Sequence, residues 1–172
     1  NGTYIKHLMI IHAGNGQENT NLPGNIWSHR WAIGGAESVD GVYAYSYTCV
    51  PESGRLGVLA HEFGHDLGLP DLYDADYSAN GLSQGAGKWD IMANGSWNAT
   101  SGNPAGTSPS NLSAWCRVYL GWEAPTILNT NSPMSFSNEN GVSEVFKIVP
   151  PTTASGNEYY LVEYRRRIGF DA

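Results

Sequence analysis

Two histidines four residues apart, with a glutamate directly after the first, are the residues in this sequence best suited to chemistry. They are His61, Glu62 and His65, in the run HEFGHDLGLPD. On a helix, side chains four residues apart share one face, with Cβ atoms about 5–6 Å apart. Two imidazoles so arranged can bind one Zn²⁺ at about 2.0–2.1 Å each, and an adjacent carboxylate can take a proton from a metal-bound water. The spacing therefore predicts a zinc site with Glu62 as its general base.

A third protein ligand is expected nearby, because catalytic zinc usually has three protein ligands and one open position for water. Gly68 supplies a left-handed helix stop, after which the chain can return Asp71 toward the metal. Asp74 is the alternative third ligand. Asp66 is disfavoured because it points about 100° away from His65 around the helix. We predict that the metal ligands are His61, His65 and Asp71.

The helix that must position these side chains is predicted from about Arg55 to Leu67. Its apolar stripe, at three- and four-residue steps, consists of Leu56, Leu59, Phe63 and Leu67. Ser53 is the expected N-cap, and Gly68 marks the end. Gly57 and Gly64 each lower the stability of the helix by about 1 kcal/mol relative to Ala. Their presence would be explained if a strand packed closely on that face of the helix.

The remaining pattern predicts an α+β domain in which a mixed twisted sheet packs on this helix. Residues 74–107 are predicted to form a long loop; a loop of this length is usually functional or disordered, and its aromatic residues favour an ordered one. Leu112–Leu120 is predicted to form a second helix. His7–His12 is a continuous apolar run that predicts a buried strand. Further strands are predicted at Val42–Thr48, Val145–Val149 and Tyr159–Tyr164.

Length and composition limit the classes of protein. The chain has 172 residues, 41% of them hydrophobic and only 15% charged, which fits one globular domain. A net charge of −7 argues against nucleic acid as the main partner, because phosphate binding needs a basic surface. Apolar runs are too short for a membrane span. Cys49 and Cys116 permit one disulfide or two buried thiols.

Met92 lies in the run WDIMANG, about twenty residues after Asp71. A methionine in such a loop is ordinarily a core residue, and the sharper interpretation is a methionine turn beneath the zinc. Asp90 could then orient a ligand imidazole. A donor that stabilises the oxyanion is also expected. The residues that could provide it are His29, Tyr73, Tyr77 and Trp97, and the sequence does not choose among them.

Several of these segments together resemble one known family. They are His61–Asp74 (HEFGHDLGLPDLYD), Gly87–Met92 (GKWDIM), Gly95–Trp97 (GSW) and Leu120–Trp122 (LGW). The chain is similar along nearly its whole length to the immune inhibitor A family of bacterial secreted metallopeptidases.

The resemblance implies a zincin or metzincin-like catalytic domain with a methionine-bearing loop and a second helix in its C-terminal part. It implies a secreted zinc endopeptidase that acts on proteins or peptides, and it adds structural calcium as a second cofactor to look for. Family members are usually longer, so we expect residues 1–172 to be a single catalytic domain from a longer protein. The alternative is a catalytically silent, zinc-containing binding or adhesion module. Cleavage preference and oligomeric state are not predicted.

Overall fold

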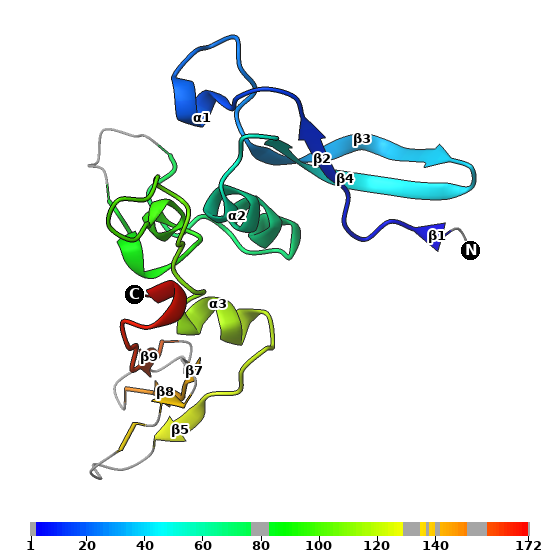
Figure 1. The fold of residues 1–172 in the computed structure, drawn as a ribbon. Helices are drawn as coiled ribbons and strands as arrows, with labels where there is room; N and C mark the ends of the chain where they lie inside the picture. Colours follow the sequence, from blue (N-terminus) through cyan, green and yellow to red (C-terminus); the bar gives the residue numbers. More distant parts are fainter. Residues whose placement is uncertain are drawn as a thin grey trace.

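A helix between two sheet regions organises the molecule (Figure 1). The computed structural model describes residues 3–76, 83–128, 135–136, 138–139, 142–150 and 158–171. Within them, α2 (Leu56–Asp66) lies below an N-terminal sheet, and a smaller sheet lies in the C-terminal part of the chain. The fold is therefore mixed, with sheets and few helices, as the sequence pattern predicts.

The N-terminal sheet is built around β4 (Val42–Pro51). Strand β3 (His29–Val39) pairs antiparallel along one edge of β4, and the two are joined at Asp40 and Gly41, both with positive φ. Positive φ at both central residues is the geometry of a tight hairpin turn. On the other edge of β4, β1 (Thr3–Tyr4) and β2 (Met9–His12) pair parallel with different halves of the strand. A short helix, α1 (Gln17–Thr20), lies in the connection from β2 to β3.

Strand β2 is present where the apolar run predicts it, but the expectation that it is buried is wrong. Ile10 is 42% exposed and Ile11 is 62% exposed. Among the described residues the strand forms a ladder with β4 alone, and apolar residues on a strand become buried only when another layer covers them. Strand β3 has no counterpart in the sequence prediction. Gly34 and Gly35 interrupt its alternation, and its register with β4 shifts between Ala32 and Glu37.

Helix α2 packs against β4, β3 and the short 3₁₀ helix η2 (Asn94–Trp97). Its N-cap is Arg55, not Ser53, because the chain first makes a turn in which the amide of Gly54 donates to the carbonyl of Pro51 (2.9 Å). At the other end Gly68 has φ +98°, the left-handed conformation expected of a helix stop.

The two glycines of α2 do allow close packing, but against a turn and not against a strand. A Cβ at Gly57 would overlap the backbone carbonyl of Ser96, and one at Gly64 would overlap the sulfur of Met92. The turn from Asp90 to Gly95 and η2 therefore lie directly on the helix. Residues of this turn form a buried cluster with neighbouring apolar side chains; its members are Leu69, Ile91, Met92 and Cys116.

The predicted loop 74–107 contains the short 3₁₀ helices η1 (Gly87–Trp89) and η2, and its residues 77–82 lie outside the described part of the chain. The second helix, α3, covers Ala114–Tyr119, shorter than predicted. Its N-cap Ser113 is extended, so the preceding residues are not helical.

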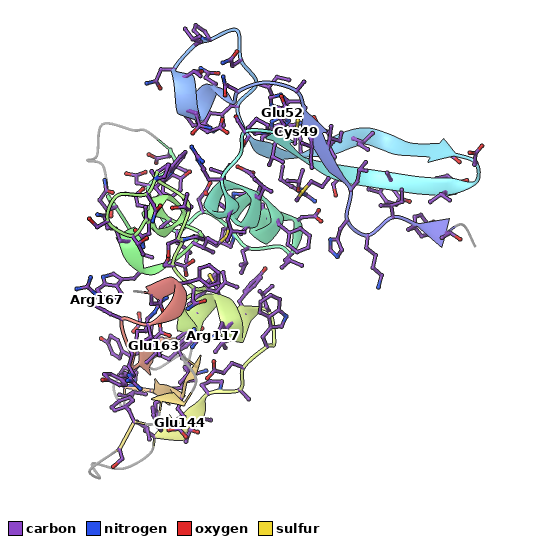
Figure 2. The ribbon with its side chains drawn as sticks, in the orientation of Figure 1. Cys49, Glu52, Arg117, Glu144, Glu163 and Arg167 are labelled. Carbon is purple, nitrogen blue, oxygen red and sulfur yellow. The ribbon has the colours of Figure 1, made fainter. Side chains whose placement is uncertain are left out.

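Among the described residues of the C-terminal part, two strands occur where the sequence predicts them, and three short strands were not predicted. Here β8 (Val145–Ile148) pairs parallel with β5 (Thr126–Leu128) and antiparallel with β9 (Tyr160–Glu163). Figure 2 shows Arg117 of α3 beside Glu163 of β9, and their side chains form an ion pair at 3.0 Å. A two-stranded ladder joins β6 (Asn138–Glu139) and β7 (Val142–Ser143), and the 3₁₀ helix η3 (Gly169–Asp171) follows β9.

Both cysteines are buried and free, so the structure has two thiols and no disulfide between Cys49 and Cys116. In the described part of the chain, every helix is too short or too polar to cross a membrane.

Candidate metal centre and active-site cleft

Helix α2 brings His61 and His65 together on one face, as their spacing predicts. Their rings meet edge to face, with centroids 4.7 Å apart and an interplanar angle of 86°. The two Nε2 atoms approach to 3.1 Å. Each ring is partly buried, with 13% of the His61 side chain and 20% of the His65 side chain exposed.

Backbone carbonyls determine which nitrogen of each ring faces the other. The Nδ1 of His61 is 2.8 Å from the carbonyl oxygen of Ile91, and the Nδ1 of His65 is 2.8 Å from that of Leu69. A carbonyl oxygen can only accept, so each Nδ1 carries the hydrogen and each neutral ring presents a bare Nε2 lone pair. Two lone pairs that point at each other repel unless a cation lies between them.

Asp71 completes the group. After the left-handed turn at Gly68, the chain returns and places Oδ1 of Asp71 3.2 Å from Nε2 of His61 and 3.4 Å from Nε2 of His65. This oxygen is buried and makes no hydrogen bond of acceptable geometry. Among the described residues, the three are the one group of His, Cys, Asp or Glu side chains whose ligand atoms converge closely enough for a metal.

The electrostatics of the group favour a positive charge. Burial alone would raise the pKa of Asp71, but the two imidazoles outweigh burial and hold that pKa well below its usual range. Burial alone would lower the pKa of His65, but Asp71 and the Leu69 carbonyl outweigh it and raise that pKa. Without a metal the site therefore attracts a proton, and a metal cation can satisfy the same three atoms.

The spacing of the three atoms fits zinc. Ligands at about 2.0–2.1 Å from a tetrahedral ion are separated from one another by roughly 3.3 Å. The observed separations are 3.1, 3.2 and 3.4 Å. A structural zinc site is normally closed by four protein ligands. Three protein ligands at the wall of a cleft leave the fourth coordination position of the metal open.

Glu62 lies on the wall of the same cleft as the two histidines and is only 7% exposed. Burial raises the pKa of its carboxyl group, and the positive charge that His61 and His65 can carry partly opposes that shift. In the described part of the chain no donor forms a hydrogen bond with its carboxylate. Glu62 is thus a buried carboxylate beside the candidate metal ligands, free to accept a proton.

Other aspartates of the region lie elsewhere. The side chain of Asp66 interacts with His7 at 2.5 Å and with Ser46 at 3.4 Å, away from the candidate ligands. Asp74 accepts from the backbone amide of Asp76 at 3.3 Å and does not join the group. The alternative in which Asp74 is the third ligand is therefore not favoured by the geometry.

The suggestion that Asp90 orients a ligand imidazole directly is wrong, because backbone carbonyls hold both rings. The carboxylate of Asp90 accepts instead from the amides of Met92 (2.7 Å) and Ser113 (2.9 Å). Met92 is completely buried and packs against α2 at Gly64, one residue before His65. Its side chain therefore lies directly against the ligand-bearing helix, and the methionine turn stays a prediction.

A cleft of about 420 Å³ opens beside the three ligand atoms. One wall is the start of β3 with the residues before it, and the other is the turn at 93–97. Among the suggested oxyanion donors, His29, Tyr73 and Trp97 line this cleft, and Tyr77 lies outside the described residues. The position of His29 on β3 could not be foreseen, because β3 itself was not predicted.

Most of the chain matches one known protein family. The family model "Immune inhibitor A peptidase M6, catalytic domain" matches residues 1–124. The chain belongs to this peptidase family. The matched segment contains the candidate ligands, Glu62 and the Met92 turn, and it ends before β5.

Two curated relatives of this M6 peptidase domain are similar over the same part. Immune inhibitor A of Bacillus thuringiensis subsp. alesti is 45% identical, over 63% of this chain and 17% of that protein. The pre-pro-metalloprotease PrtV of Vibrio cholerae serotype O1 is 39% identical, over 67% of this chain and 14% of that protein. The chain thus spans less than a fifth of the length of either relative.

Proposed function

We propose that this M6 domain is a zinc-dependent endopeptidase that hydrolyses peptide bonds in proteins. The observation that carries the proposal is the convergence of two bare imidazole nitrogens and one buried carboxylate oxygen within 3.1–3.4 Å, with the carboxylate of Glu62 in the same cleft. The name of PrtV, a metalloprotease, supports the same class of activity.

His61, His65 and Asp71 would hold the zinc. When bound, zinc polarises a scissile carbonyl and lowers the pKa of a coordinated water toward about 7. Glu62 would receive the proton of the attacking water on its carboxylate and deliver it to the leaving amine. The Ile91 and Leu69 carbonyls keep the imidazoles in the tautomer that offers Nε2 to the metal.

We infer that the substrate lies as an extended peptide along β3. Within the described residues β3 pairs with β4 alone, so its other edge has free backbone groups. The beginning of the strand lines the cleft, where a peptide can add to the sheet by main-chain hydrogen bonds. Trp31 and Trp97, which are 67% and 37% exposed, also line the cleft and would contact apolar substrate side chains.

The zincin-like architecture belongs to this proposal as well. A sheet packed on the ligand-bearing helix and a buried methionine turn against that helix support it. We further propose that residues 1–172 act as one catalytic domain of a longer secreted protein. Structural calcium remains a prediction from the resemblance.

Hydrolysis of casein provides the test. We expect the chain to cleave casein, a chelator to stop cleavage, and added zinc to restore it. A chain that binds one zinc per molecule and cleaves no protein would contradict the proposed activity and favour the silent binding module. A chain that cleaves casein equally well after complete metal removal would contradict the proposed metal dependence.

A further inference from the structure

A buried carboxylate holds the turn whose Ile91 carbonyl orients His61, one of the candidate ligands. It belongs to Asp90, whose side chain is fully buried and does not reach the metal site. Asp90 stands between η1 and the turn that contains Met92. Neither the proposed hydrolysis nor metal binding uses this residue directly, so its burial needs another explanation.

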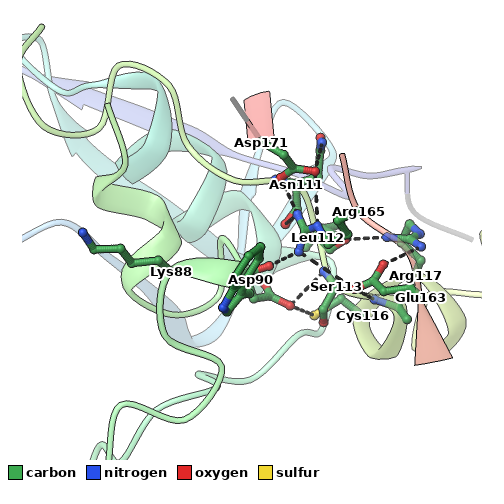
Figure 3. Close-up of polar contacts among 12 residues, drawn as sticks. Lys88, Asp90, Asn111, Leu112, Ser113, Cys116, Arg117, Glu163, Arg165 and Asp171 are labelled. Carbon is green, nitrogen blue, oxygen red and sulfur yellow. Dashed lines mark hydrogen bonds and ion pairs between the residues drawn. The ribbon is translucent and has the colours of Figure 1, made fainter. Parts of the chain in front are cut away.

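The Asp90 carboxylate accepts three hydrogen bonds, from two segments of the chain. Oδ1 accepts from the amide of Met92 at 2.7 Å. Oδ2 accepts from the amide of Ser113 at 2.9 Å and from the thiol of Cys116 at 3.2 Å (Figure 3). Burial, followed by the charge of Asp90, raises the pKa of Cys116 to about 12, so the thiol keeps its proton and remains a donor. The carboxylate therefore joins the Met92 turn to the beginning of α3.

The backbone of Asp90 holds the same turn. Its carbonyl oxygen accepts from the amides of Ala93 at 3.0 Å and Gly95 at 3.1 Å. The turn therefore has a fixed shape from both the main chain and the side chain of Asp90. No water is needed to satisfy these backbone donors, because the carboxylate and carbonyl oxygens reach them directly.

His61 is bonded to this turn directly, and Asp71 and His65 are linked to it through the neighbouring residues Leu72 and Leu69. The carbonyl of Ile91 accepts from Nδ1 of His61 at 2.8 Å. The carbonyl of Met92 accepts from the amide of Leu72 at 2.8 Å, directly after Asp71. The carbonyl of Leu69 orients His65, and the Leu69 side chain packs in one buried cluster with Ile91 and Met92.

We propose that Asp90 is the positioning residue of the metal centre. Through the turn it sets the orientation of His61 and the approach of Asp71, and it couples both to α3 and the C-terminal part of the domain. This inference rests on the proposed metal site. Asparagine at this position would offer one oxygen in place of two, and its NH₂ group would face a donor. The turn would then move, and the ligand atoms with it.

Zinc affinity, measured by competition with a chelator of known affinity, tests the proposal. Asp90→Asn should weaken zinc binding about tenfold or more, the lower end of the effect of outer partners on metal affinity. Glu163→Gln is the matched control. Glu163 accepts from the amide of Ala114 at 3.2 Å, pairs with Arg117 and lies 3.9 Å from Nη1 of Arg165, so it holds the same helix α3 and has no contact of its own with the turn. The zinc affinity of Glu163→Gln should stay within about threefold of that of the original chain, because this change removes no hydrogen-bond partner of a candidate ligand.

Equal zinc affinities for the original chain and for Asp90→Asn would overturn the inference and leave the proposed activity standing. Equal losses in Asp90→Asn and Glu163→Gln would also overturn it, because support of α3 alone would explain both. An original chain that binds no zinc would overturn the proposed function and this inference together.

Hydrogen exchange on the original chain decides the matter if Asp90→Asn does not fold. We expect saturating zinc to slow exchange at the amides of Leu72, Met92 and Ser113 together, because the proposal makes them one unit with the ligands. Slower exchange confined to the amides of α2 would overturn the proposal.

Discussion

Replacement of Glu62 by glutamine is the sharpest single test of the proposed chemistry. The two side chains have nearly the same shape, so the surroundings of Glu62, which is only 7% exposed, should accept glutamine. Among the described residues no donor is bonded to the carboxylate, and hence no partner is left unsatisfied by the change. Burial raises the pKa of Glu62, which means that the site disfavours the charge and should tolerate a neutral amide. Folding and zinc binding should therefore persist.

Hydrolysis should fall because an amide cannot take up the proton of the attacking water. A positioned general base contributes about 10²–10⁴ in rate. At about 1.36 kcal/mol for each factor of ten, that range corresponds to roughly 3–5 kcal/mol of transition-state stabilisation. With a fluorogenic peptide as substrate, we expect kcat to fall by this factor and KM to stay nearly unchanged. The reason is that Glu62 would act on the reacting water and not on peptide binding.

Glu18→Gln is the matched control, since it makes the same chemical change in the same cleft. The Glu18 carboxylate accepts from Oγ and the amide of Ser28, at 2.6 and 3.2 Å, and is not among the candidate metal ligands. Its effect on kcat should stay below about tenfold, because it lies outside the proton path. Glu62 would not be the general base if zinc-loaded Glu62→Gln kept more than about a tenth of the activity, or if Glu18→Gln lost as much activity as Glu62→Gln.

Three further changes have defined outcomes. Asp71→Asn should weaken zinc binding by more than the 10–100-fold typical of outer partners, by chelator competition, since it removes a direct ligand; unchanged affinity would exclude Asp71. Gly57→Ala should lower the free energy of unfolding by about 1–3 kcal/mol in urea, despite its better helix propensity, because its Cβ would overlap the Ser96 carbonyl; a gain in stability would contradict the packing. Burial alone would raise the pKa of Asp171, but hydrogen bonds, first from Arg165, outweigh it and lower that pKa. The ionised Asp171 therefore contributes its full stabilisation above its unfolded pKa of about 3.9, and this contribution is lost as the pH falls through its lower, folded pKa. The difference in free energy of unfolding between the original chain and Asp171→Asn should disappear below about pH 4. A difference independent of pH would contradict this ion pair.

The parts of the site that depend on local spacing were predictable from the sequence. His61 and His65 face each other because they are four residues apart on a helix whose stripe and stop are themselves local patterns. The return of Asp71 follows from the left-handed turn at Gly68, which lies only three residues before it. Such features need no knowledge of the rest of the fold.

The features that depend on contacts between distant parts of the chain were not predictable from the sequence. Carbonyls of Ile91 and Leu69 orient the imidazoles, and every residue type has a carbonyl, so no sequence signal marks them. Strand β3 is held by its pairing with β4 across an irregular register, and its own alternation is too weak to predict it. Exposure of Ile11 depends on what covers β2, which a run of apolar letters does not reveal.

The proposed zinc site can be tested by locating the bound ion and its ligands. An anomalous difference map from crystals of the zinc-loaded chain would locate the ion. We expect one strong peak within about 2.0–2.2 Å of Nε2 of His61, Nε2 of His65 and an oxygen of Asp71, with a water as the fourth ligand. A fourth ligand from the protein, or a peak bound elsewhere, would contradict it.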